Sequence, residues 1–127
     1  MTTFFCPNCW KEIPGSTEIC PHCGIDITRF WTSMNYEQKL IHALGHPEPT
    51  TVMRAAWLLG ERGLEEAVPA LVELTEKTDD IYIILEAVRA LGKINTPASR
   101  KALRSLSDHS AAMIRREVKE ILKKNQP

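Results

Sequence analysis

Residues 55–60 read AAWLLG, and residues 87–92 repeat the pattern as AVRALG. The glycines that close these two stretches are 32 residues apart, and the register continues downstream without a gap. It pairs Ala70 with Ala102, Leu71 with Leu103, and Leu74 with Leu106. A repeat of this length, with apolar residues at helical spacing, is typical of stacked helix pairs. The sequence therefore predicts a mostly α fold built as a short solenoid, not a single globular core.

Partial copies of the repeat flank the two full ones. Downstream, Ile114, Val118 and Leu122 match Ile83, Ala87 and Leu91 at an offset of 31; upstream, Leu40, Ile41 and Leu44 match Ala70, Leu71 and Leu74. We expect Gly60 and Gly92 to end one helix of each pair, and polar segments at 45–49, 78–80 and 95–97 to separate helices. The predicted helices lie near residues 35–44, 50–61, 65–76, 80–92, 97–106 and 110–124.

This part of the chain resembles the HEAT-like repeats of phycobilin-lyase relatives and of many small prokaryotic proteins. The likeness covers residues 35–124 and rests on an aliphatic residue, often followed by Arg, then Ala, then Leu-Gly at the helix end. Arg115 keeps the Arg position, whereas Val52 and Ile84 occupy it in the two full repeats. The resemblance implies that the second helix of each pair lines the surface that usually faces a ligand.

All four cysteines lie within the first 23 residues, as two C-x-x-C pairs. The pairs are Cys6 with Cys9, and Cys20 with Cys23. Two such turns, brought together, supply four thiolates at about 2.3 Å from one Zn²⁺ ion. We favour a single structural zinc, which the small lobe needs in order to fold. The alternatives are a mononuclear iron site, a redox dithiol and disulfides. Disulfides are disfavoured because the N-terminal residues do not have the pattern of an export signal.

The spacing of the cysteine pairs also predicts how the lobe is built. We expect a hairpin whose turn is at residues 13–16, with Gly15 in the left-handed region, and whose strands are residues 4–5 and 18–19. The lobe resembles the short bacterial and archaeal zinc ribbons over residues 4–28, with the four cysteines at the ligand positions and Gly24 matching the residue after the second pair. All four ligands are then committed, so no coordination position remains for catalysis, and His22 is a surface side chain.

Trp10 departs from the zinc-ribbon pattern, because a glycine is expected after the first cysteine pair as well. A tryptophan there either accepts an unfavourable φ or changes the turn. Its side chain either covers the metal site against Phe30 or Trp31, or is exposed for contact with another molecule. We favour packing, and we favour it for Trp57 as well, because tryptophan is seldom left fully exposed.

The two parts are expected at residues 1–30, the zinc ribbon, and 31–127, two full repeats with a partial repeat at each end. A repeat stack needs polar end caps. The last predicted helix provides one, with Arg115, Arg116, Lys119, Glu120, Lys123 and Lys124 beside its apolar stripe. The first helix is preceded by apolar residues such as Phe30 and Trp31. We therefore expect the ribbon to fold back and cap that helix.

Sixteen basic and sixteen acidic residues give a formal net charge of zero. The signs are segregated, since residues 61–86 hold eight acids and residues 100–127 hold eight bases. The acidic block interrupts any basic groove, and the basic end has no Phe, Trp or Tyr to stack on bases. The outward ridge of the second helices supplies the candidate partner surface, namely Lys39, His42, Val72, Glu73, Lys101 and Arg104.

Function follows from the surface and from the missing catalytic motifs. The sequence has no Gly-rich phosphate loop, nucleophile elbow or paired acid and base. We expect a cytoplasmic, non-enzymatic scaffold that binds a protein partner, with no membrane span and with its oligomeric state open. Nucleic-acid binding by the ribbon and the basic C-terminal helix is the alternative. A lyase or chaperone-like role in cofactor attachment rests on the family resemblance alone.

Overall fold

The computed structural model describes residues 4–125, and within them the chain forms a small hairpin followed by helices. The elements are β1 (Phe4–Phe5), β2 (Glu12–Ile13), α1 (Ile27–Thr32), α2 (Tyr36–His42), η1 (Ala43–Gly45), α3 (Pro49–Arg62), η2 (Glu65–Ala67), α4 (Val68–Lys77), α5 (Ile81–Ile94), α6 (Pro97–Ser105), η3 (Leu106–Asp108) and α7 (Ala112–Lys124). The six predicted helices are confirmed as α2 to α7, with boundaries shifted by a few residues. The short helix α1 was not predicted.

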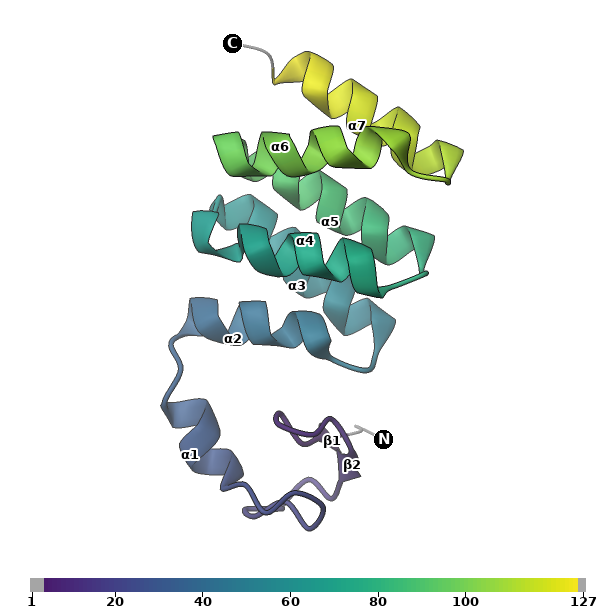
Figure 1. Cartoon of the computed structure of the whole chain (residues 1–127). Helices are drawn as coiled ribbons and strands as arrows, with labels where there is room; N and C mark the ends of the chain where they lie inside the picture. The colour runs from purple at the N-terminus through teal and green to yellow at the C-terminus, as the bar shows by residue number, and fades with distance from the viewer. Residues whose placement is uncertain (1–3, 126–127) are drawn as a thin grey trace.

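The helices form two layers (Figure 1). One layer holds α2, α4 and α6, and the other holds α3, α5 and α7, with α5 in the middle of the stack. The repeat register coincides with the core: Leu59 and Leu91 are both fully buried in the second layer, and Leu71 and Leu103 are both fully buried in the first. The mostly α fold with a small N-terminal hairpin is therefore confirmed.

Local sequence explains where the helices begin. Asn35 and Gln38 form a reciprocal capping box at the start of α2, with hydrogen bonds of 2.9 and 2.8 Å. Thr96 and Ser99 do the same for α6, and Asp80 accepts a hydrogen bond from the Tyr82 amide at the start of α5. Each cap satisfies backbone donors that a helix cannot satisfy itself, worth about 1 kcal/mol.

The repeated glycines do not end helices, and that prediction is wrong. Gly60 and Gly92 lie inside α3 and α5, which end at Gly63 and Asn95 in the left-handed region, with φ of 61° and 50°. The repeated glycines instead permit close packing. A Cβ on Gly60 would lie 2.8 Å from the Cα of Ala90 in α5, and one on Gly92 would lie 2.6 Å from Cγ2 of Ile121 in α7. The repeat thus specifies contacts between successive helices of the second layer.

The two glycines give a matched pair of predictions. An alanine in a helix interior gains up to about 1 kcal/mol over glycine in helix propensity. In Gly60→Ala this gain is outweighed, because the new methyl meets backbone that cannot rotate away, and we expect a net destabilisation of about 1–2 kcal/mol. In Gly92→Ala the nearest obstacle is the Cγ2 methyl of Ile121, a side-chain group that can shift more readily than backbone, so we expect a smaller change. Urea unfolding of both variants checks this; equal losses would contradict it.

The loops that precede α3, α5 and α7 each contain the same kind of hydrogen bond, in which a side chain accepts from the backbone amide two residues later. His46 Nδ1 accepts from the Glu48 amide at 3.0 Å, and His109 Nδ1 accepts from the Ala111 amide at 2.9 Å. Between them, Thr78 Oγ1 accepts from the Asp80 amide at 3.1 Å. These three side chains occupy equivalent register positions, so the two histidines, which look scattered in the sequence, have the same structural role.

None of the helices in the described part of the chain combines the length and the apolar character that crossing a membrane requires.

Candidate metal centre and its contact with the helices

Each cysteine pair lies in the tip of its own tight loop. In the first, the Cys6 amide donates to the Lys11 carbonyl at 2.9 Å and the Trp10 amide donates to the Cys6 carbonyl at 2.8 Å. Fourteen residues later the pattern recurs, from Cys20 to Ile25 and from Gly24 to Cys20, at 3.0 and 2.9 Å. The lobe is therefore two similar loops facing each other.

The strand pairing differs from the prediction because each cysteine pair has its own loop. Strand β1 pairs with β2 around the first cysteine pair, and not with residues 18–19; Ile19 instead forms a bridge to Asp26 around the second pair. Gly15 is not among the residues with positive φ. Its role is spatial, because a Cβ there would lie 2.5 Å from the Phe4 ring.

The four sulfur atoms converge on one point and can hold a metal ion. All lie within 4.8 Å of one another, and the Cys6–Cys23 and Cys9–Cys20 sulfurs are 3.6 and 3.7 Å apart. A tetrahedral ion about 2.3 Å from each sulfur requires sulfurs about 3.8 Å apart. A disulfide requires about 2.05 Å. The geometry therefore fits a four-thiolate metal site and no disulfide.

Backbone amides stabilise negative charge at this site. The amides of Asn8 and His22 donate to Cys6 Sγ and Cys20 Sγ, both at 3.4 Å. Burial raises the pKa of the Cys6 thiol to about 11. Burial also opposes ionisation of Cys20, but hydrogen bonds from backbone amides and neighbouring thiols outweigh it and lower its pKa to about 6. The amide of Ile25 and the side chain of Asn8 lower the pKa of Cys23. A cation would stabilise all four thiolates further.

Trp10 accepts the unfavourable backbone conformation. Its φ is 60°, against 80° for Gly24 at the equivalent place in the second loop. A non-glycine residue in this region costs on the order of 1–2 kcal/mol. The side chain offsets the cost by packing: its ring stacks on His42 at 5.0 Å, contacts the His46 ring at 5.2 Å, and lies over Gly45. Packing is confirmed, although the partners are histidines of α2 and of the loop after η1.

His42 joins the ribbon to the helical stack. Its Nε2 donates a hydrogen bond to the Pro7 carbonyl, with 2.5 Å between the two atoms. Phe30 and Trp31 also contact its ring, with centroids 5.1 and 5.8 Å away. The ribbon thus packs on the first repeat helix, as the sequence predicted. His42 is half-buried and its ring contacts the ribbon, so its place on a partner surface stays a prediction.

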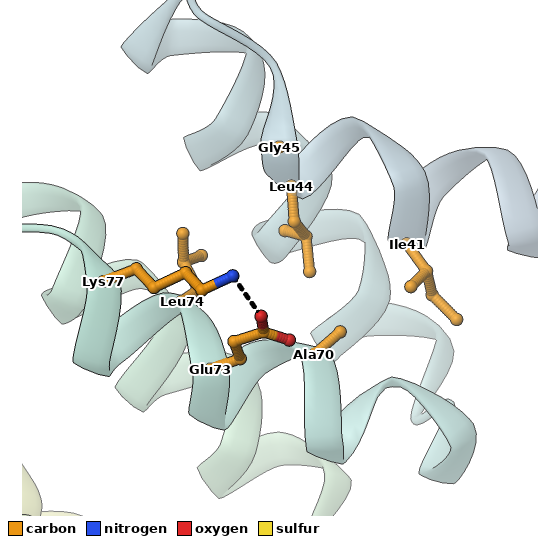
Figure 2. Close-up of a pocket in the computed structure, with 7 residues that line it drawn as sticks. All are labelled: Ile41, Leu44, Gly45, Ala70, Glu73, Leu74 and Lys77. Carbon is orange, nitrogen blue, oxygen red and sulfur yellow. Dashed lines mark ion pairs between the residues drawn. The ribbon is translucent and has the colours of Figure 1, made fainter. Parts of the chain in front are cut away.

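The other predicted partner residues lie in the layer of α2, α4 and α6. Lys39 and Val72 are half-buried, whereas Glu73, Lys101 and Arg104 are exposed. Among these, Glu73 borders a groove of about 300 Å³ between α2–η1 and α4 (Figure 2). Its lining is Ile41, Leu44, Gly45, Ala70, Glu73, Leu74 and Lys77. Figure 2 shows the apolar side chains of the two walls facing one another beside the Glu73–Lys77 ion pair.

The apolar lining of this groove follows the repeat register, but the register alone does not indicate a groove. Ile41 and Leu74 are half-buried, so part of the pattern that indicates a core faces an open surface. The packing expected for Trp57 is only partly met: its side chain is 49% exposed, and Lys93 Nζ lies 5.5 Å from its ring centroid.

The comparisons with known proteins bear on the helical part. No curated protein matches the chain. A family model described as HEAT repeats matches residues 37–123, which run from α2 to the end of α7 and make up more than half of the chain. The spacing of the repeats, the two-layer stack and this match agree. The chain therefore belongs to the HEAT-repeat family.

Proposed function

We propose that this protein is a non-enzymatic interaction module in which one structural Zn²⁺ holds the ribbon as a cap on a short HEAT-repeat stack. The observation that carries the proposal is the groove between α2–η1 and α4. It has an apolar floor and one ion pair at its edge, and Gly45, which lines it, also contacts Trp10 of the ribbon. The ribbon thus supports one wall of a surface suited to a protein side chain or helix.

Zinc is the favoured metal because four thiolates in tetrahedral array are typical of structural zinc sites. Once all four ligands are protein side chains, the ion has no open position for a substrate or a water molecule. The ion would order the two loops that carry Pro7 and Trp10, the residues that contact His42. Its role would therefore be to position the cap.

A photo-crosslinking experiment tests the groove as a binding surface. A photoreactive amino acid at Glu73 should capture one stoichiometric protein from native lysate, whereas the same residue at Arg54, exposed on the opposite layer, should not. The variant Ala70→Glu, which places a charge in the groove, should reduce binding of the captured protein at least about tenfold. Capture that is equal at both positions, or unaffected by Ala70→Glu, would rule out the groove.

A further inference from the structure

The last helix carries positive charge where the other helices of its layer carry apolar residues. At the repeat offset of 31, Arg115, Arg116, Lys119 and Lys123 of α7 take the places of Ile84, Leu85, Val88 and Gly92 of α5. All four α5 residues are buried, and the neighbour of Gly92 is Ile121 of the next helix. All four cations are exposed. We call these four cations the end-face patch.

The end-face patch lies on the side of α7 that faces away from the stack. Figure 1 shows α7 as the last helix of the described chain, with the ribbon at the opposite end. A groove of about 580 Å³ opens there, and its lining is Ser107, Arg115, Lys119, Leu122 and Lys123. Leu122 is the register equivalent of Leu91, which is fully buried, but it is only half-buried. The groove thus combines an apolar residue with three cations and no acid.

An end helix that only keeps the stack soluble can carry cations and anions in a mixture, and does not require charges of a single sign. In α3 and α5 of this layer three cations form ion pairs, namely Arg62 with Glu37, Lys93 with Glu61, and Arg89 with Glu86 and Glu117, whereas Arg54 forms none with the described residues. Within residues 4–125, no carboxylate forms an ion pair with any cation of the end-face patch. Arg115 donates to the carbonyls of His109 and Ser110, which fixes its position without neutralising its charge. Glu120 is the register equivalent of Arg89, and both are exposed; it does not line the groove.

We propose that the end-face patch docks an acidic amphipathic helix of a partner protein, which extends the stack by one helix. Arg115, Lys119 and Lys123 recur every four residues, or about 6 Å along the helix. Acidic side chains at the same spacing on a packed helix can pair with them, while an apolar side chain of that helix covers Leu122. Single-stranded nucleic acid fits less well, because none of the lining residues is aromatic. A DNA duplex, which needs only cations to contact its phosphates, is included in the test.

The test uses the metal-loaded full chain and labelled peptides of about 18 residues, long enough for five helical turns. One peptide carries leucines at helical spacing flanked by glutamates. A second has the same composition in scrambled order, a third replaces the glutamates by lysines, and a DNA duplex completes the set. Fluorescence anisotropy should show binding of the first peptide, at least about tenfold weaker binding of the scrambled one, and none of the lysine peptide.

Charge reversal locates the site. The double variant Lys119→Glu/Lys123→Glu should weaken binding of the first peptide about tenfold, whereas Arg29→Glu/Arg54→Glu, with the same change in net charge on other exposed surfaces, should leave it within about twofold. If circular dichroism shows that the first variant is unfolded, Lys119→Gln/Lys123→Gln replaces it with about a threefold expected loss. Equal binding of the scrambled peptide, equal loss in the control variant, or binding of DNA alone would overturn the proposal.

Discussion

Replacing Cys20 by serine is expected to abolish stoichiometric metal binding and to unfold the ribbon. Cys20 is almost fully buried among the other thiols, and a serine hydroxyl is a poor substitute for a thiolate. Structural zinc sites contribute on the order of 10 kcal/mol to the folding of small domains, so three remaining ligands should not hold the lobe together. The helical stack then loses its contacts with Pro7 and Trp10, and we expect the whole chain to melt at a lower temperature.

Metal analysis and thermal unfolding measure the two consequences of Cys20→Ser. The control is His22→Ala, because His22 is exposed in the same loop and contributes only its backbone amide to a sulfur. That variant should bind one equivalent of metal and melt as the parent chain does. A Cys20→Ser protein with a full equivalent of metal and an unchanged melting temperature would refute the four-thiolate site.

The second large effect is expected at the centre of the stack. Leu91 is fully buried in α5, which contacts α3, α4, α6 and α7. Replacing a buried leucine by alanine removes its transfer free energy and leaves a cavity, at a cost of about 3–5 kcal/mol. In a repeat stack each helix is stabilised mainly by its neighbours, so loss at the centre should weaken the coupling of both ends.

The repeat supplies the control for Leu91→Ala. Leu122 holds the equivalent position in α7 but is only half-buried, so Leu122→Ala should cost less than half as much. Urea unfolding followed by circular dichroism compares the two variants. Similar losses at the two positions would mean that the register does not determine burial in this stack.

The sequence was sufficient for the features that depend on periodicity. Apolar residues 32 apart in the two full repeats, such as Leu59 and Leu91, are both buried because each repeat places them in the same environment. The four cysteines were sufficient to predict a cluster of thiols that can hold a metal ion, since a C-x-x-C turn brings two thiols together wherever it occurs. These patterns are local or repeated, so they are visible without knowledge of the packing.

Features that depend on distant contacts were not predictable. Gly60 and Gly92 were interpreted as helix ends because glycine often ends helices, but what decides their role is a neighbouring helix 30 residues away in sequence. His42 was interpreted as a surface residue. Its contacts with Pro7 and Trp10 join the two parts of the chain, so no local pattern in the sequence reveals them. The departure of Trp10 from glycine was the visible sign that this loop has a second role.

Amide hydrogen exchange tests most directly whether the metal-bound ribbon is an integral cap of the stack. Exchange is measured on the metal-loaded chain and again after chelation, at residues 40–45 next to the ribbon and at residues 85–91 in the centre of α5. Loss of the cap should speed exchange at residues 40–45 at least about tenfold, with a smaller change at residues 85–91. Exchange at residues 40–45 that does not change on metal removal would show that the ribbon is an independent appendage.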